Sequence, residues 1–128
     1  MIGGKEEISD IPQRIKRFRS IVNGVKRSII ERTEEYSKTV DIQDKANLNG
    51  VQRRIHQFGM ILNAILSGNE NDMTNKIANH FKRNDFDFNT LSDEDRGLCE
   101  HYIKMDIFMY PYDLNLPHIN SVSKTGDA

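Results

Sequence analysis

The chain contains few of the residues that mark a disulfide-bonded, secreted or membrane-spanning protein. Among its 128 residues there are one cysteine, three prolines and no tryptophan. Because Cys99 is alone, no intramolecular disulfide can form, and a reducing compartment is the default. The most apolar run, residues 60–66, is interrupted by Asn63 and is far shorter than the roughly 20 residues that cross a bilayer.

Signals for export, lipid attachment and cofactor binding are also missing. The first seven residues, MIGGKEE, contain no apolar region of a secretory signal, and Ile2 replaces the glycine that N-myristoylation requires. There is no glycine-rich phosphate loop, and the four histidines are not spaced like zinc ligands. These absences predict a soluble cytoplasmic protein with no membrane association, no cofactor and no metal.

Two apolar stripes with steps of three and four residues dominate the first half of the chain. The first consists of Ile8, Ile11, Ile15, Phe18, Val22, Val25, Ile29 and Tyr36, and the second of Leu48, Val51, Ile55, Phe58, Leu62 and Ile65. Such spacing keeps one narrow side of a helix apolar, as in coiled coils and helical bundles. Since a short polar segment joins the stripes, they predict a long antiparallel helical hairpin over about 11–37 and 43–67.

The second half of the chain predicts two shorter helices. One spans about 71–83 and would bury Met73, Ile77 and Phe81. The other spans about 92–109, opens at Ser92 with Asp95 as a partial capping box, and would bury Leu98, Tyr102, Met105 and Met109. Phe86 and Phe88, in the loop between these helices, would cover the end of the bundle. The predicted fold is therefore all-α, with residues 1–110 as a single domain and residues 111–128 as an extended, partly disordered tail.

The second long helix has more apolar surface than one hairpin seam requires. Met60, Ile61 and Leu66 widen its stripe, so this helix needs partners on more than one side. Two shorter helices would leave part of that surface uncovered, and uncovered apolar patches usually mark association sites. We therefore expect a homodimer or a protein partner.

Charge is distributed unevenly although the net charge is only −1. Residues 1–68 carry 12 Lys and Arg against 8 Asp and Glu, a surplus of four positive charges, whereas residues 69–128 carry 6 against 11. Between Pro12 and Ile30 there is no acid, and the basic residues are Arg14, Lys16, Arg17, Arg19, Lys26 and Arg27. Such a stretch can bind nucleic-acid phosphates. It can also form a solvated helix surface, or face the acidic half of this chain or of a second copy.

One string favours an enzyme. In Arg96-Gly-Leu-Cys-Glu-His101 an arginine precedes a histidine by five positions on a late helix. This resembles the catalytic motif of HEPN ribonucleases, although Gly97 replaces the polar residue that follows the arginine in that family. The resemblance implies RNA cleavage in which Arg96 and His101 of two subunits meet across a dimer cleft.

By elimination, the leading hypothesis is a non-enzymatic helical protein-interaction module, such as a small adaptor, chaperone, immunity protein or regulator. The predicted binding residues are four surface cations beside the first stripe and two tyrosines in the proline-bounded segment 110–117: Arg14, Arg17, Lys26, Arg27, Tyr110 and Tyr112. That segment either docks on a partner or folds back on the bundle. The alternatives are a nucleic-acid-binding regulator that uses the basic first helix and a HEPN-like ribonuclease.

Overall fold

The computed structural model describes residues 11–40 and 44–114, without the side chains of residues 33–49. Within these ranges there is no β-strand, and the four α-helices are α2 (Gln13–Val40), α3 (Asp44–Leu66), α4 (Asp72–Arg83) and α5 (Asp93–Ile103). A short 3-10 turn, η1 (Phe88–Thr90), precedes α5, and α5 continues directly into a π-helical segment, η2 (Lys104–Met109). The prediction of an all-α fold is confirmed. None of the described helices is long and apolar enough to span a membrane.

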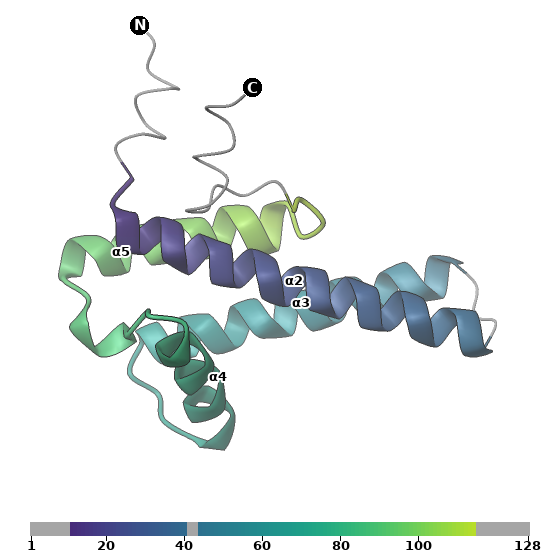
Figure 1. The fold of residues 1–128 in the computed structure, drawn as a ribbon, viewed down its shortest axis with the longest axis horizontal. Coiled ribbons are helices and arrows are strands. Elements are labelled where there is room, and N and C mark those ends of the chain that lie inside the picture. The colour runs from purple at the N-terminus through teal and green to yellow at the C-terminus, as the bar shows by residue number, and fades with distance from the viewer. Residues whose placement is uncertain (1–10, 41–43, 115–128) are drawn as a thin grey trace, which may run out of the picture.

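The long helices α2 and α3 run antiparallel as a hairpin, and α5–η2 lies along the first part of α2 (Figure 1). The pairing of Arg14 with Asp95 and of Lys26 with the chain after residue 105 shows that α5–η2 runs in the same direction as α2. The short helix α4 crosses one end of this three-helix bundle.

The buried core joins the two predicted stripes to the last helix. The buried residues of α2 and α3 have the predicted spacing, whereas those of α5–η2 were not predicted. The principal core residues are Ile15, Phe18, Val22, Val51, Ile55, Phe58, Leu62, Cys99, Ile103 and Ile107. Cys99 is fully buried, and burial is the main cause that raises the pKa of its thiol to about 12. The heptad pattern therefore correctly identified the inward sides of α2 and α3 over the residues whose side chains are described, whereas Ile8, Tyr36 and Leu48 of the stripes lie outside them.

An aromatic cluster closes the end of the bundle. Phe86 and Phe88 are buried, as predicted, and their rings lie 5.0 Å apart between centroids, edge to face. Both rings also contact Phe18 of α2 and Phe81 of α4 at centroid distances of 5.1–6.2 Å. Tilted and edge-to-face aromatic pairs of this kind add to the stabilisation that burial provides.

The predicted buried face of α4 is wrong at its first position. Met73 is 52% exposed, whereas Phe81 is fully buried and Thr74 takes the inward position. The reason is a capping box, because Thr74 Oγ1 accepts a hydrogen bond from the Asn71 N–H while Asn71 Oδ1 accepts one from the Thr74 N–H. This cap fixes the start of α4 so that Met73 points to solvent.

The predicted buried face of α5 is also displaced. Met109 is exposed, and Leu98, Tyr102 and Met105 are only half-buried. The inward positions are one residue later and include Asp95 and Asp106, whose charges are paired with arginines of α2. Ser92 caps α5 as expected, since its Oγ accepts a hydrogen bond from the Asp95 N–H. The Asp95 carboxylate, however, pairs with Arg14 rather than completing a capping box.

Two glycines shape α3. A Cβ at Gly59 would lie 2.7 Å from Ile107 Cγ2 and 2.8 Å from Phe108 Cζ, so only glycine lets η2 pack this closely on α3. Gly68 has φ of +87° and ends the helix, with hydrogen bonds from the Gly68 N–H to Ile65 O and from the Asn69 N–H to Ala64 O.

Candidate functional site

The structure divides the basic stretch of α2 between two sides of the helix. Arg14, Arg19 and Lys26 pair with α5, η2 or the chain that follows η2. Arg17 and Lys26 are nine positions apart, which places them on opposite sides of a helix, about 180° around its axis. The sequence grouped them as one basic flank, and the structure separates them.

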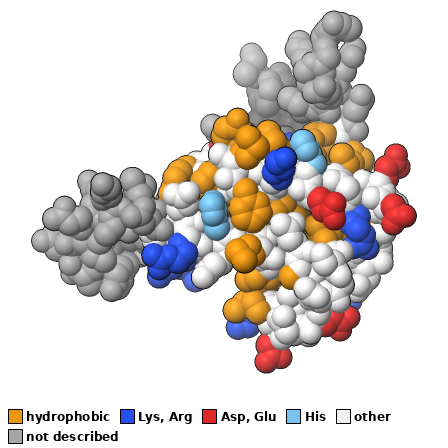
Figure 2. Space-filling model, turned by 180° about the vertical axis from the view of Figure 1, so that it is seen from behind, with side chains coloured by type: hydrophobic (Ala, Val, Ile, Leu, Met, Phe, Trp, Pro, Cys, Tyr) orange, Lys and Arg blue, Asp and Glu red, His pale blue; other side chains and the backbone are white. Residues whose placement is uncertain are grey.

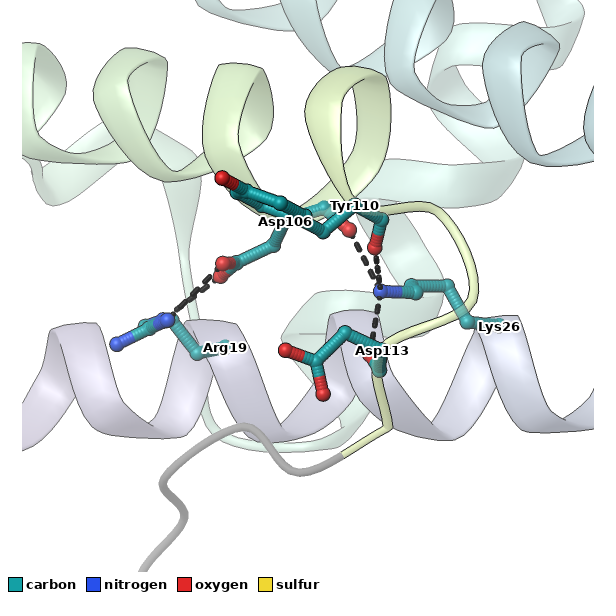
Figure 3. A network of polar contacts seen from close by, with 5 residues as sticks. All are labelled: Arg19, Lys26, Asp106, Tyr110 and Asp113. Carbon is teal, nitrogen blue, oxygen red and sulfur yellow. Dashed lines mark hydrogen bonds and ion pairs between the residues drawn. The ribbon is translucent and has the colours of Figure 1, made fainter.

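On the inward side, Arg19 is held by Asp106 of η2. Its Nε and Nη2 donate to Asp106 Oδ2 and Oδ1 at 2.7 and 2.9 Å (Figure 3). Its guanidinium also lies 4.0 Å from the ring centroid of Tyr102. The side chains of Arg19 and Asp106 are nearly buried, at 11% and 8% exposed. A bidentate, stacked arginine of this kind is a fixed structural contact.

Lys26 continues this network as a cap for the end of η2. Its ammonium donates to three backbone carbonyls, those of Asp106 (2.5 Å), Asp113 (2.7 Å) and Tyr110 (3.2 Å) (Figure 3). The last carbonyls of a helix have no partners within the helix and carry its negative dipole end, so a cation there is stabilising. Burial lowers the pKa of Lys26, while the Asp106 and Asp113 carboxylates oppose that shift.

The prediction that Lys26 is a surface cation is therefore wrong. Its side chain is fully buried, because the flank of α2 on which it lies faces a helix end that needs hydrogen-bond donors. Arg14 is less constrained: its Nε lies 2.8 Å from Asp95 Oδ2, but its side chain is 56% exposed. An ion pair that is open to solvent on one side contributes little stability.

The outward side of α2 forms one wall of a groove with a volume of about 560 Å³. We call it the α2–α4 groove, and it is lined by Arg17, Ser20, Ile21, Gly24, Val25, Ser28, Ile29 and Arg32 of α2 with His80 and Asn84 at the end of α4. From Arg17 to Arg32 the α2 wall is about 22 Å long. The wall therefore extends over about four turns of α2.

Two interleaved rows of side chains make up this wall. Ser20, Gly24 and Ser28 recur every fourth residue, and a Cβ added to Gly24 would meet nothing within 4 Å. Small residues at this spacing let another backbone approach closely. Ile21, Val25 and Ile29 form a parallel apolar row and are packed against the core on their inner side. Val25 and Ile29 therefore serve the predicted seam and the groove together.

The described lining of the groove carries positive charge. Arg17 and Arg32 line its two ends on α2, His80 lines it from α4, and none of the described lining residues is acidic. Among the predicted binding residues, Arg17 is thus placed in a cavity, whereas Arg27 is exposed and does not line it. Sequence reasoning missed Arg32, His80 and the row of small residues, although Gly24 within a helical pattern was the visible signal.

The predicted tyrosines are on the other side of α2. The carbonyls of Tyr110 and Asp113 bind Lys26, so residues 110–114 fold back on α2. The rings of Tyr110 and Tyr112 are 53% and 42% exposed. Residues 115–128 of the predicted tail lie outside the described residues. Hydrophobic side chains also gather on the face shown in Figure 2. Of the residues that were predicted to widen the apolar stripe of α3, Met60 is exposed and Leu66 is buried.

The structure gives Arg96 a structural partner. Arg96 Nη1 donates to the carbonyl of Leu66 at 2.5 Å and so caps the end of α3. His101 is exposed and lies edge to face with Tyr102. Five positions on an α-helix correspond to about 140° of rotation, so Arg96 and His101 of one chain point in different directions. Among the described residues there is no group of three or more His, Cys, Asp or Glu that could hold a metal ion.

No protein-family model, curated protein or solved structure is significantly similar to this chain.

Proposed function

We propose that this chain is a non-enzymatic protein-interaction module whose α2–α4 groove binds an amphipathic helix of a protein partner. The partner helix carries an apolar stripe flanked by acidic residues. The observation that supports this proposal is the groove itself, in which an apolar row, a row of small residues and a positively charged border occur together on one wall.

The shape of the groove favours a helix as the bound element. Apolar residues at positions 21, 25 and 29 match the repeat of one side of a helix, so a second helix can place its own apolar residues between them. The adjacent Ser20, Gly24 and Ser28 leave room for its backbone. Recognition of a helix in a groove uses this combination of apolar anchors and close approach.

The charge of the groove favours an acidic partner. Arg17, Arg32 and His80 line it, and no acidic residue does so in the part of the chain whose side chains are described. Glutamates beside the apolar stripe of the partner would therefore find cations at both ends. Such complementary charges increase the association rate and select among partners more than they raise affinity. The attraction should weaken as salt is added.

A fluorescence-anisotropy titration tests the proposal. The probe is a labelled helical peptide of about 18 residues, with leucines every third or fourth position and glutamates on both sides of that stripe. A matched peptide has lysines in place of the glutamates. The glutamate peptide should bind at least about tenfold more tightly than the lysine peptide. Equal binding of the two peptides, or no binding of either, would overturn the proposal.

Three variants locate the binding site. Arg17→Glu reverses one cation of the groove, and Gly24→Leu fills the groove with a side chain that has open space around it. Each should weaken binding of the glutamate peptide by about tenfold or more. Arg53→Glu is the matched control, because Arg53 is exposed on α3 and does not line the groove. If all three variants bound alike, the groove would not be the site.

The nucleic-acid alternative is supported by the same cations, but two of the six basic residues of the stretch, Arg19 and Lys26, are paired and withdrawn from solvent. A labelled DNA duplex in the same titration distinguishes the two functions. DNA binding that is weakened equally by Arg17→Glu and Arg27→Glu would replace the proposed function by the nucleic-acid one. Sedimentation equilibrium of the protein alone would reveal the predicted homodimer, in which a second copy is the partner.

A further inference from the structure

A second cavity, with a volume of about 470 Å³, lies on another side of α4. Its walls are the turn after α3, one face of α4, the loop around η1 and the start of α5. Asparagines project from three of these elements: Asn69 from the turn, Asn75 and Asn79 from α4, and Asn89 from η1. We call this cavity the asparagine pocket. None of its described lining residues also lines the α2–α4 groove.

The carboxamides of Asn75 and Asn79 have no hydrogen-bond partner among the described residues. They are four positions apart on α4, which places them on one face and about 6 Å apart along the axis. Both are exposed. The neighbouring asparagines differ, since Asn71 caps α4 and Asn84 Nδ2 donates to the His80 carbonyl. Asn75 and Asn79 thus present two free donor-and-acceptor groups to the pocket.

This spacing is close to the repeat of an extended peptide. In a strand, every second residue presents its N–H and C=O to the same edge, at intervals of about 6.6 Å. A carboxamide offers one acceptor and two donors, so it can accept from the N–H and donate to the C=O of one peptide residue. Two carboxamides about 6 Å apart can therefore bind two alternate residues of one extended chain.

The charges around the pocket favour a neutral polar ligand. Lys82 and Arg96 line it as cations, and Glu70 and Asp87 line it as anions, so the lining has no net charge from these groups. Arg96 already donates to the Leu66 carbonyl, and the Asp87 carboxylate accepts from the Asn89 N–H. A peptide backbone is neutral and rich in hydrogen-bonding groups. A sugar is neutral too, but the aromatic ring that lines the pocket, Phe88, is buried in the core and offers little surface for stacking.

We propose that the asparagine pocket binds a short extended peptide segment of a protein partner through its backbone, with Asn75 and Asn79 as the recognising groups. Because the contacts are to the backbone, binding depends on the extended form of the peptide more than on its side chains. The pocket and its ligand are independent of the helix proposed for the α2–α4 groove.

NMR titration of the full chain tests this proposal through the side-chain NH₂ signals of asparagine. The probe is acetyl-Ala-Thr-Ala-Thr-Ala-amide, and a second peptide of the same sequence is N-methylated at every residue, so that the residues of neither edge keep an N–H donor. The unmodified peptide should shift the Asn75 and Asn79 signals in a saturable way. The N-methylated peptide should bind at least about tenfold more weakly, since its residues have lost the N–H donors of both edges.

Alanine variants test whether Asn75 and Asn79 contribute to peptide binding, and they should not destabilise the fold. Asn75→Ala and Asn79→Ala lie at exposed helix positions where alanine is favourable, and each should reduce binding by about fivefold or more. Asn63→Ala, at an exposed position of α3 outside the pocket, should leave it unchanged. The proposal is overturned if the N-methylated peptide binds equally well, if no peptide shifts the two signals, or if maltotriose shifts them and the peptide does not. Arg17→Glu should not affect this titration. The failure of the asparagine-pocket proposal can therefore be distinguished from the failure of the groove proposal.

Discussion

The two sides of α2 carry similar cations but face different surroundings. On the inward side, Arg19 and Lys26 meet a carboxylate and the carbonyls at the end of η2, and both are withdrawn from solvent. On the outward side, Arg17 and Arg32 border an open groove whose described lining contains no acidic residue. One helix thus uses the same residue types both to hold the bundle together and to present a binding surface.

The difference shows that a basic stretch in a sequence is not a measure of basic surface. The charge of Arg19 is matched by Asp106 at 2.7 Å, and the charge of Lys26 is surrounded by carbonyl oxygens. Removing a partner on this side leaves buried polar groups without hydrogen bonds, which is costly. Removing a cation on the outward side leaves no buried polar group without a hydrogen bond, so it should cost little stability.

The largest expected effect is that of Lys26→Met. Methionine keeps most of the stem, but the carbonyls of Asp106, Tyr110 and Asp113 lose their shared donor. We expect the free energy of unfolding to fall by about 3 kcal/mol in urea denaturation. Arg27→Met is the control and should change it by less than about 0.5 kcal/mol. A similar small loss in both variants would mean that the Lys26 cap contributes no stability.

Asp106→Asn should have the next largest effect. The asparagine can accept only one of the two hydrogen bonds from Arg19, and the guanidinium is left without its counter-charge in a nearly buried site. The expected loss is about 2 kcal/mol of unfolding free energy. Because the network is shared, the loss should be smaller when Arg19 has already been replaced by methionine. Strictly additive losses in this double-mutant cycle would contradict the pairing.

The two glycines Gly59 and Gly24 should respond to alanine in opposite directions. At Gly59 the added methyl group would collide with Ile107 and Phe108, and we expect destabilisation of about 1–2 kcal/mol. At Gly24 the space is open, so alanine should stabilise the helix by about 0.5–1 kcal/mol. Thermal unfolding of the two variants side by side measures both changes. A stabilising Gly59→Ala would contradict the close approach of η2 to α3.

The smallest effect is a pH dependence that belongs to Lys26. Burial lowers the pKa of Lys26 in the folded chain below the ordinary 10.5 of the unfolded chain. At pH values between the lowered pKa and 10.5, the unfolded chain therefore binds more protons than the folded one. Stability contributed by this group therefore rises with pH through that window. The difference in unfolding free energy between the native chain and Lys26→Met should grow in the same direction. A difference that shrank with rising pH would show that the folded state favours the charged lysine.

The inward side of α2 was predictable from the sequence only in its apolar part. Ile15, Phe18 and Val22 follow a local repeat, and a repeat of three and four residues is sufficient to identify the buried side of a long helix. The partners of Arg19 and Lys26 are 80 to 87 positions away in the chain. No local pattern can bring such residues together.

The last helix illustrates the same limit. Its apolar residues predicted a buried face through Leu98 and Tyr102. The buried side instead includes Asp95 and Asp106, because each of these carboxylates pairs with an arginine of α2. In an apolar repeat, an aspartate is expected on the surface of a helix. The continuation of α5 as a π-helix over Lys104–Met109 changes the register further.

The outward site was half visible in the sequence. The small residues Ser20, Gly24 and Ser28 can be read directly from it, and Gly24 is conspicuous within a helix. What turns this row into one wall of a groove is the opposite wall, which His80 and Asn84 supply from the end of α4. The position of α4 depends on the aromatic cluster and on the Asn71 cap, neither of which an α2 pattern contains.

The division of α2 into an inward and an outward side is tested most directly by labelling arginines in the native protein with phenylglyoxal, followed by mass spectrometry. Arg17 and Arg19 are two positions apart, on opposite sides of the helix. Arg17 should be modified at a rate similar to that of exposed Arg27, whereas Arg19, which is bound to Asp106 and packed on Tyr102, should be protected at least about tenfold. Equal modification of Arg17 and Arg19 would contradict the division.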